Sequence, residues 1–271
     1  MKNQPDLFAA NDDHHEPGVV RVLYIDTETT GSDPSSADVC EIGAVLAPYE
    51  GLKPAGGARE EFESLVKPSE PIPPEASAVH HITDSMVSEA PLLGQIERKL
   101  SDLAGKADLV CAHNAPFDLP ILRRLLPSVF GRFGEDVVLD SLRLAKHVWP
   151  DIPSHALQVL RYRFDLGQGI AGDAHRALFD AHLVRRLVEL VIASARTGCS
   201  NWRELLEYTR SPLEIQTFGF GKYRGSLVED VIAQDADYVR WLLQQKWVPI
   251  EQPDLYYTLL RKTGPQAHGG K

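Results

Sequence analysis

The sequence has few of the residues that build disulfide-bonded or membrane-spanning proteins. Its three cysteines, Cys40, Cys111 and Cys199, have the spacing of neither a disulfide framework nor a metal cluster. They are typical of small core residues in a reducing compartment. No apolar run approaches the roughly 20 residues of a membrane helix, and the acidic, polar N-terminus does not resemble a signal peptide. We therefore expect a cytoplasmic protein without a membrane partner.

Positive charge is also scarce. The formal net charge is −10 over 271 residues, which argues against a broad, non-specific coat of nucleic acid. Residues 121–163 differ from the rest of the chain. This segment contains seven basic and four acidic residues, so its local net charge is +3. This stretch is either a local phosphate-facing surface or a set of ordinary exposed helix faces.

The composition that remains is that of a globular protein, with 43% hydrophobic and 24% charged residues. Hydrophobic patterning predicts strands at 19–25, 39–48 and 60–68, joined as hairpins with a Gly/Pro-rich turn at 51–57. Two shorter strands are expected at 108–112 and 137–139. Helices are expected at 74–79, 95–103, 115–126, 141–147, 155–162 and 175–194. This order predicts an α/β fold, a mixed sheet flanked by helices.

Residues 24–31, Tyr-Ile-Asp-Thr-Glu-Thr-Thr-Gly, place two carboxylates at the end of the first strand. Asp26 and Glu28 are two positions apart, so their side chains share one face of the strand. Two carboxylates in one small volume repel each other unless a cation lies between them, and a hard divalent cation with oxygen ligands fits. The alternative is a pair of solvated acids at a strand end. The Thr-Thr-Gly turn that follows has backbone N–H groups that could approach a phosphate.

Two later stretches add two acids and a histidine. Cys-Ala-His-Asn-Ala-Pro-Phe-Asp, at 111–118, places Asp118 in the first turn of a helix, where the helix dipole alone would favour an acid. His-Arg-Ala-Leu-Phe-Asp, at 175–180, places His175 five residues before Asp180. From the start of a helix His175 can reach the same cleft as Asp180, although a lone histidine there is more often structural.

In this order and spacing, Asp-x-Glu-Thr-Thr-Gly, His-Asn-Ala-x-Phe-Asp and His-Arg-Ala-x-x-Asp-Ala resemble the 3′→5′ exonucleases of the DEDDh group. The resemblance covers roughly residues 19–195, and shorter matches at 42–44, 81–83, 140–142 and 155–157 agree with it. It implies a ribonuclease H-like fold with a mixed five-stranded sheet flanked by helices.

The resemblance also implies roles for the motif residues. Asp26, Glu28, Asp118 and Asp180 would hold two Mg²⁺ or Mn²⁺ ions, and His175 would be the general base that takes a proton from water. The chemistry is consistent with this, because two metals about 4 Å apart stabilise both the attacking and the leaving oxygen of a phosphodiester. The unperturbed pKa of histidine, about 6.5, suits proton removal at neutral pH.

Further residues are implied as substrate contacts: Thr29, Thr30, His81, Ile82, Asn114 and Phe117. The two threonines would approach the terminal 3′-OH, the 81–82 pair would pack on the last base, and the last two would lie near the scissile nucleotide. For Ile82 and Phe117 the alternative is core packing.

The C-terminal part has a motif of its own. Phe-Gly-Phe-Gly-Lys-Tyr-Arg-Gly, at 218–225, interleaves aromatic residues, which stack on bases, with glycines and with basic residues, which meet phosphates. Lys222, Tyr223 and Arg224 are therefore candidate nucleic-acid contacts, and the alternative is that Tyr223 and Trp241 form the core of a very small domain. Together with Asp-Tyr-x-x-Trp-Leu at 237–242, the motif resembles a module that follows the exonuclease domain in proteins similar to bacterial exodeoxyribonuclease X.

The polar N-terminal tail contains one apolar pair, in Gln-Pro-Asp-Leu-Phe at 4–8, which has no core to join and could dock into a partner's groove. Through Gln4, Leu7 and Phe8 it resembles the peptides by which bacterial replication and repair proteins bind the sliding clamp. A similar stretch at 252–256 is expected to belong to a C-terminal helix.

These interpretations divide the chain into a disordered tail (1–17), an exonuclease domain (18–196), a linker with a helix (197–216), a small α+β module (217–262) and a second disordered tail (263–271).

From the motifs we expect an enzyme that hydrolyses DNA in the 3′→5′ direction from single-stranded or frayed ends and releases 5′-mononucleotides, in repair or replication. The motifs leave open an exoribonuclease that trims RNA and a proofreading exonuclease that serves a polymerase. A binding module without catalysis is disfavoured by the intact acids and His175. No stretch indicates an oligomeric state.

Overall fold

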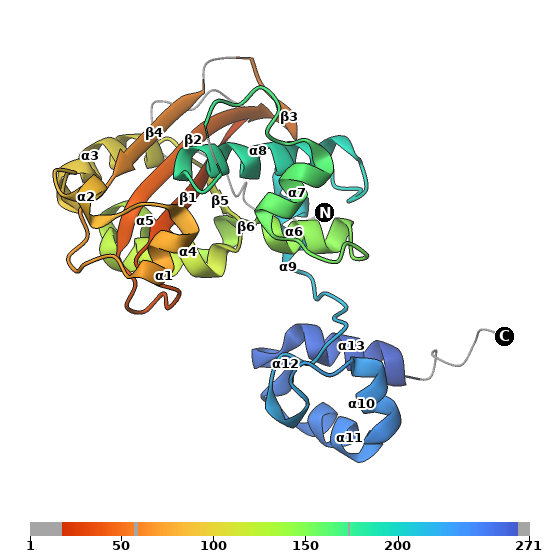
Figure 1. Ribbon diagram of the computed structural model, residues 1–271. Helices are drawn as coiled ribbons and strands as arrows, with labels where there is room; N and C mark the ends of the chain where they lie inside the picture. The colour runs from red at the N-terminus through yellow and green to blue at the C-terminus, as the bar shows by residue number, and fades with distance from the viewer. Residues whose placement is uncertain (1–17, 57–58, 173, 265–271) are drawn as a thin grey trace. The chain divides into compact units, whose positions relative to one another are not determined.

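The structure, a computed structural model, describes residues 18–56, 59–172 and 174–264. The chain divides into two compact units, Met1–Thr209 and Arg210–Lys271 (Figure 1). The N-terminal tail predicted at 1–17, with its clamp-binding peptide, lies outside the described residues, as does most of the tail predicted at 263–271. No helix in the described ranges is both long and apolar enough to cross a bilayer.

The first unit is organised around a mixed sheet in the order β3-β2-β1-β5-β6, with β4 paired to β2. Its antiparallel part consists of β1 (Val19–Thr29), β2 (Val39–Glu50), β3 (Lys53–Pro54) and β4 (Glu60–Leu65). Its parallel part adds β5 (Leu109–Ala112) beside β1 and then β6 (Val138–Asp140). The sheet has six strands rather than the predicted five, because the two-residue β3 is too short to show any hydrophobic alternation.

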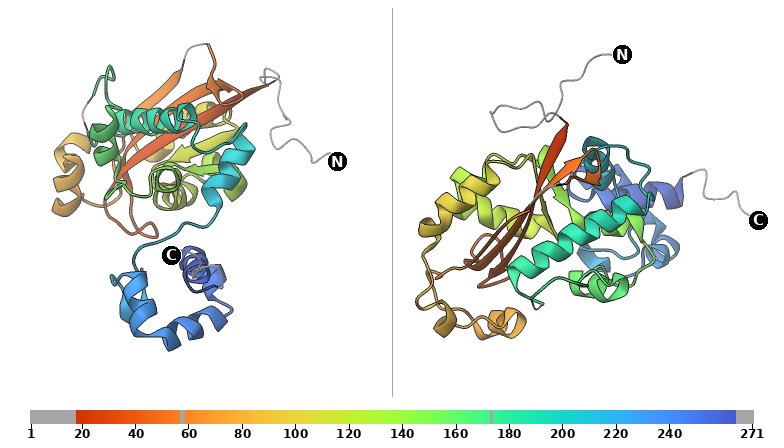
Figure 2. Two further views of the ribbon diagram at one scale, coloured as in Figure 1. Left: turned by 90° about the vertical axis from the view of Figure 1, so that its right-hand side faces the viewer. Right: turned by 90° about the horizontal axis from the view of Figure 1, so that it is seen from above.

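Helices cover both faces of this sheet (Figures 1 and 2). One face packs against α3 (Leu93–Ala104), α4 (Ala115–Leu125) and α5 (Pro127–Phe130). The other packs against α6 (Ser141–Val148), α7 (Leu157–Phe164), α8 (Ala177–Ala193) and α9 (Trp202–Arg210). Two short helices follow the hairpins, α1 (Pro74–His80) and α2 (Asp84–Val87). The predicted mixed α/β fold is confirmed.

β1 supplies side chains to both cores. Val22 and Tyr24 pack on the α8 side and Leu23 and Ile25 on the α4 side, and all four are fully buried. A strand buried on both faces requires a continuous apolar run, which residues 22–25 provide. Burial of each such side chain stabilises the fold by roughly 1.5–3 kcal/mol. β1 is therefore a rigid central support for the residues at its end.

α9 belongs to the first unit. Its Trp202 is buried and its ring centroid lies 5.0 Å from that of Tyr49 on β2. Leu205 and Leu206 are buried in the same core. The first unit extends to Thr209, beyond the boundary predicted at residue 196, and the helix expected within 197–216 packs on the core of this unit.

The second unit is helical. Its elements are the 3₁₀ turn η2 (Gly221–Tyr223), α10 (Val228–Gln234), α11 (Ala236–Gln244), α12 (Val248–Glu251) and α13 (Pro253–Thr263). In the described part of this unit the β-structure is one isolated bridge, between Thr217 and Leu227. The structure corrects the predicted α+β class of the module, because its described β-structure is limited to this antiparallel bridge, which closes a turn that contains Gly221 and Gly225, both at positive φ. The stretch 252–256 lies at and within the start of α13, as expected.

Candidate active site

Four acids from three elements meet at one end of the sheet. Asp26 and Glu28 come from the end of β1, Asp118 from the first turn of α4, and Asp180 from the first turn of α8. Glu28, Asp118 and Asp180 are buried, and Asp26 is half-buried. The helix N-termini favour the two aspartates that they hold.

Gly43 explains how α8 comes so close to β1. It is the β2 residue paired with Asp26 across the sheet. A Cβ on Gly43 would lie 2.0 Å from the backbone nitrogen of Leu178 and 2.1 Å from the carbonyl carbon of Ala177. Because glycine alone permits this approach, the first turn of α8 lies directly against β2 and brings Asp180 toward Asp26.

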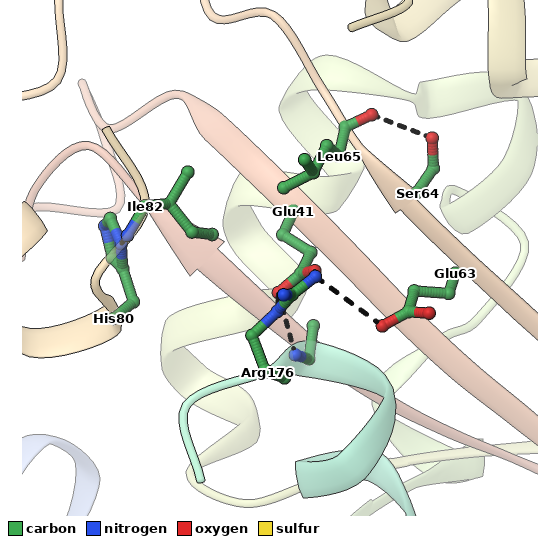
Figure 3. A network of polar contacts seen from close by, with 8 residues as sticks. Glu41, Glu63, Ser64, Leu65, His80, Ile82 and Arg176 are labelled. Atoms are coloured by element: carbon green, nitrogen blue, oxygen red, sulfur yellow. Dashed lines mark hydrogen bonds and ion pairs between the residues drawn. The ribbon is translucent and has the colours of Figure 1, made fainter. Parts of the chain in front are cut away.

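A buried ion pair anchors the segment before α8 (Figure 3). Glu41 on β2 is fully buried, and the Arg176 side chain donates to its carboxylate from Nε (3.0 and 3.2 Å) and from Nη2 (2.5 Å). The backbone N–H of Ala177 donates to the same carboxylate at 3.0 Å. Glu63 lies on the other side of Arg176, at 3.8 Å. This arrangement fixes the chain on both sides of the Arg176–Ala177 bond.

The sequence interpretation did not include Glu41. The signal was present, since Glu41 interrupts the apolar run of β2 and a buried carboxylate requires a charged or hydrogen-bonded partner. What the sequence could not show is that the partner is Arg176, which lies 135 residues further along the chain.

His175 precedes α8 and has a left-handed backbone conformation, with φ of 61°. Its backbone N–H donates to Asp180 Oδ2 at 3.2 Å. A ring nitrogen of His175 and carboxylate oxygens of Glu28 and Asp180 all lie within 4.8 Å of one another. The structure thus brings the half-buried His175 to the acids, and these three residues could hold a metal ion.

Two of the acids have fixed orientations. Thr27 Oγ1 donates to Asp118 Oδ1 at 2.6 Å, and Gln158 Nε2 on α7 donates to Asp180 Oδ1 at 2.8 Å. Arg161 in turn donates to Gln158 Oε1 at 3.3 Å. Thr27 and Gln158 were not predicted as site residues, because nothing in their local sequence distinguishes them from other polar residues.

Burial raises the pKa values of all four carboxyl groups, and repulsion by the neighbouring acids of the cluster adds to the effect for Asp26 and Glu28. For Asp26, burial and then repulsion by Asp118 and Asp180 raise the pKa well above its ordinary value. Burial, followed by repulsion from Asp180, raises the pKa of Glu28 to about 8. Burial also raises the pKa of Asp118 to about 7, against the hydrogen bond from Thr27. The pKa of Asp180 is raised by burial, which the hydrogen bond from Gln158 opposes.

Such a cluster fits a hard divalent cation. Its donor atoms are carboxylate oxygens with one imidazole nitrogen, and the ionised forms repel one another until positive charge is added. A bound dication removes the repulsion that raises these pKa values. The acidic cluster could therefore bind metal.

A cleft of about 470 Å³ adjoins the acids. One wall is the end of β1 and the following turn, and it includes Glu28, Thr29 and Thr30. The rest of the lining includes four apolar residues from the start of α1, from α1 itself and from α4, namely Pro73, Ala76, Val79 and Phe117, together with Glu75 and His80. Phe117 is half-buried, so the predicted Phe117, Thr29 and Thr30 all border this cleft.

The turn after β1 is internally bonded. Thr29 Oγ1 donates to the carbonyl of Gly31 at 2.9 Å. The Thr30 N–H donates to the Asp38 carbonyl, and Thr30 Oγ1 accepts from the Asp38 N–H, both at 2.9 Å. The Thr30 N–H therefore has a partner within the protein, which weakens the expectation that it approaches a phosphate.

The neighbouring 80–82 segment differs from the prediction. His80, not His81, lines the cleft, while His81 is exposed at the left-handed end of α1. Ile82 is fully buried with Cys40, Ile72 and Val87, so the core-packing alternative holds for it (Figure 3). It has no exposed surface to offer a base.

His80 links this segment to β1. It accepts from the Ile82 N–H at 3.0 Å and contacts the Thr29 carbonyl through Nε2 at 3.3 Å. Burial lowers the pKa of His80, which favours the neutral ring that both bonds require.

Asn114 lies at the start of α4, exposed and at φ of 76°, and its backbone N–H donates to Asp140 at 3.0 Å. It does not line the cleft described above. Its predicted substrate contact stays a prediction.

The predicted C-terminal contacts lie in the second unit. Lys222 Nζ and the Tyr223 hydroxyl both donate to Asp235 Oδ2 at 2.8 Å, and Asp235 caps α11 by accepting from the Tyr238 N–H. Lys222 and Tyr223 thus have a structural role. The Arg224 side chain is exposed and makes no hydrogen bond or ion pair among the described residues, while its backbone N–H donates to the Gly221 carbonyl at 3.2 Å. Gln4, Leu7 and Phe8 lie outside the described ranges.

Clustered acids and a histidine at the end of the central strand of a mixed sheet define a class, the metal-dependent nucleases that hydrolyse phosphodiester bonds. The chain belongs to the Exonuclease family, which matches residues 23–188. Residues 218–246 match a second family, described as Exodeoxyribonuclease X-like C-terminal. The predicted nuclease class and the resemblance of the first unit to exonucleases are confirmed.

Individual relatives agree. The chain is 31% identical to Exodeoxyribonuclease 10 of Escherichia coli over 237 residues, which is 87% of this chain and 95% of that protein. It is 31% identical to DNA polymerase III subunit epsilon of Treponema pallidum over 174 residues, 64% of this chain and 77% of that one. A solved structure of exonuclease X in complex with 5′ overhanging duplex DNA has a TM-score of 0.53 and 26% identity, and covers 70% of this chain and 99% of its own.

Proposed function

We propose that this chain is a 3′→5′ exonuclease that hydrolyses phosphodiester bonds from the 3′ end of DNA and releases 5′-mononucleotides. The observation that carries the proposal is the convergence of Asp26, Glu28, Asp118, Asp180 and His175 beside the cleft. The similarity to Exodeoxyribonuclease 10 and to the DNA-bound exonuclease X supports DNA as the substrate.

The four acids would hold two divalent cations, Mg²⁺ or Mn²⁺. When bound, such ions stabilise negative charge on the attacking and leaving oxygens and lower the pKa of water. Gln158 and Thr27 hold the carboxylates of Asp180 and Asp118 in position, so little reorganisation is needed on binding.

His175 takes the proton from the attacking water. Its ring lies beside Glu28 and Asp180, where the reaction would occur, and it is half-buried, so it remains accessible to water. The Glu41–Arg176 pair holds the backbone that follows His175, and the His175 N–H donates to Asp180. Both contacts limit the positions that the imidazole can take.

In this proposal the cleft receives the terminal nucleoside. Its apolar lining of Ala76, Val79 and Phe117 suits a base, and the Thr29–Thr30 turn, which also borders the cleft, would contact the 3′-OH. We further propose that the substrate end is single-stranded or frayed, since one strand end must leave its partner to enter the cleft.

An assay with strands labelled at either end tests this proposal. The protein is incubated with Mg²⁺ and 3′- or 5′-labelled single-stranded DNA and RNA, with and without EDTA. We expect a DNA ladder that shortens from the 3′ end, and no cleavage in EDTA. Asp26→Asn should lower the rate roughly 10³-fold or more while DNA binding is kept. Near-normal activity of Asp26→Asn would contradict the metal assignment.

The same assay separates the alternatives. Much faster cleavage of RNA would indicate an exoribonuclease that trims RNA. A proofreading role has one supporting observation, the similarity to subunit epsilon. It predicts that a replicative polymerase co-purifies with the chain and that mismatched 3′ ends are cleaved faster than paired ones.

We also propose a cytoplasmic location and a sliding clamp as partner of Gln4, Leu7 and Phe8. Replacement of Leu7 and Phe8 by alanine should abolish retention on immobilised clamp without a change in the rate on short DNA. Equal retention of the variant and the parent chain would contradict the clamp proposal.

A further inference from the structure

The second unit has a cationic and aromatic surface that the proposed reaction does not use. It consists of Lys222, Tyr238 and Trp241, which we call the Trp241 face. The rings of Tyr238 and Trp241 are stacked, with centroids 5.7 Å apart and planes at 22°. Lys222 Nζ lies 4.6 Å from the Tyr238 ring centroid. Trp241 is 47% exposed and the Lys222 side chain 57%.

Trp241 is not required for the core of its unit. That core is formed by other residues of the unit, among them Phe218, Val239, Leu242 and Leu255, all of which are buried. Trp247, by comparison, packs against this core and lies 5.7 Å from Phe220. An exposed tryptophan is not by itself a site, but Trp241 is stacked on Tyr238 with a lysine beside the stack, which makes it a candidate contact for a ligand.

The glycine-rich motif holds Lys222 above the ring. Asp235 binds both Lys222 and the Tyr223 hydroxyl, and it also caps the helix that presents Tyr238 and Trp241. Gly221 has φ of +67°, and a Cβ there would lie 3.1 Å from the Tyr238 hydroxyl. The motif therefore pre-positions an ammonium group beside two stacked rings.

We propose that the Trp241 face binds an unpaired base and the adjacent phosphate of single-stranded DNA. A base would stack on Trp241 and extend the Tyr238–Trp241 stack, as bases do on aromatic residues of sequence-tolerant binders. Lys222 has one N–H bond to Asp235 and further N–H groups for a phosphate. The exposed side chain of Arg224, which has no partner among the described residues, adds a second cation from the same motif.

Charge favours stacking as the main contribution. Residues 217–262 contain six basic and six acidic residues, so this segment is neutral while the whole chain is −10. A neutral module cannot hold a strand by counterion release alone. We therefore expect binding that depends on bases and depends only weakly on salt. This inference rests on the proposed function. A DNA strand bound at the exonuclease site would meet the Trp241 face of the same chain at a high effective concentration.

The test measures binding by the full chain carrying Asp26→Asn, which prevents hydrolysis. The ligands are oligothymidylate of about 20 nucleotides and a strand of the same length with an abasic tract at its 5′ part, which keeps the phosphates. Trp241→Ala should weaken binding of oligothymidylate about tenfold, a value within the effect of one lost stack. On the abasic strand the same substitution should change the affinity little.

Ile250→Ala is the matched control, because Ile250 is 79% exposed and apolar in the same unit. It should bind as the parent does. Trp241→Phe should restore part of the affinity. Equal binding by Trp241→Ala and the control would overturn the proposal. So would an equal loss on both strands, which indicates a structural role, or a change of oligomeric state with Trp241→Ala, which indicates a protein partner.

Failure of this inference is distinguishable from failure of the proposed function. On a trinucleotide, which occupies only the cleft, Trp241→Ala should leave the cleavage rate of the otherwise unsubstituted chain unchanged. An inactive parent chain that binds oligothymidylate through Trp241 would refute the exonuclease proposal and keep this one.

Discussion

Glu41 and Arg176 show how the chain positions a catalytic segment with one ion pair. Glu41 stands opposite Glu28 in the β1–β2 register, so an uncompensated charge there would repel the proposed metal ligands. Arg176 neutralises the Glu41 carboxylate. Because Arg176 directly follows His175 in the chain, the same contact also limits the position of His175. The pair thus links the electrostatics of the site to the position of the general base.

Arg176→Ala should destabilise the protein by about 3 kcal/mol, because it leaves the buried Glu41 carboxylate without its charged partner. It should also lower kcat more than it changes KM. Urea unfolding and steady-state kinetics measure the two effects. Lys106→Ala, which breaks the exposed pair with Glu60, is the control and should cost at most about 1 kcal/mol. Equal stability of the two variants would contradict the role of Arg176.

Gly43→Ala should be severely destabilising, by about 3 kcal/mol or more, because the new methyl group would overlap the backbone of α8. Gly94→Ala, on the exposed side of α3, is the matched control, since a Cβ there meets no described atom within 4 Å. The control should be neutral or slightly stabilising. Thermal unfolding compares the two, and similar melting temperatures would show that α8 does not approach β2 as described.

The raised pKa values predict a pH-dependent stability. Unfolded carboxyl groups ionise near pH 4, whereas Glu28 and Asp118 in the folded protein have pKa values of about 8 and about 7. Between these limits the folded chain binds more protons than the unfolded chain. The free energy of unfolding therefore falls as pH rises. The contribution of Glu28 and Asp118 to it is greatest below about pH 4.

In EDTA the melting temperature should fall between about pH 5.5 and about pH 8.5. Added Mg²⁺ should raise it, and by more at the higher pH, because the metal binds ionised carboxylates. Glu28→Gln should flatten the metal-free dependence, since it removes a group that titrates near pH 8. A metal-free melting temperature that rises with pH would show that the four acids do not form one repulsive cluster.

At the scale of elements, α9 closes the α8-side core of the first unit. Its nine residues fall in the segment predicted as a linker with a helix. Trp202 at its start packs on Tyr49, which also accepts a hydrogen bond from Tyr24 at 2.8 Å. The helix therefore covers the far end of the same sheet whose other end holds the acids.

Trp202→Ala should lower the free energy of unfolding by about 3–5 kcal/mol, because it leaves a large cavity beside Tyr49. Val159→Ala, at a 41% exposed position of α7, is a suitable comparison and should change stability by about 0.5 kcal/mol at most. Denaturant unfolding of both variants decides whether α9 is core or linker. A small effect of Trp202→Ala on the free energy of unfolding would indicate that the first unit ends before α9, at the boundary predicted from the sequence.

For the whole molecule, the two units separate the proposed chemistry from the proposed strand binding. The acids, His175 and the cleft lie in the first unit, and the Trp241 face lies in the second. Removal of residues 212–271 should leave the cleavage rate on short DNA within about twofold, because no residue of the site is lost. Removal of residues 198–271, which also deletes α9, should abolish folding. Melting curves and cleavage rates on short DNA test both deletions. A chain that lacks residues 212–271 and is folded but inactive would contradict the separation.

The acids and His175 could be chosen from the sequence because their chemistry is visible locally. Asp26 and Glu28 share a strand face by the period of two, and Asp118 and Asp180 stand in first helical turns. For Ile82 the sequence left a base contact and core packing open, because an apolar residue in a short loop looks the same whether it packs inward or outward, and its burial favours core packing. Glu41 was missed because its partner is distant in sequence.

By itself, the sequence determined the order of strands and helices, the acids available for metal binding and the family to which the chain belongs, because periodicity, turn residues and motif spacing are local properties. Only the tertiary structure decided which buried charge pairs with which, that α9 completes the first core, that His80 rather than His81 borders the cleft, and that Lys222 is held over a stacked tyrosine and tryptophan. These are contacts between residues far apart in the chain, and they depend on how side chains fill a common volume.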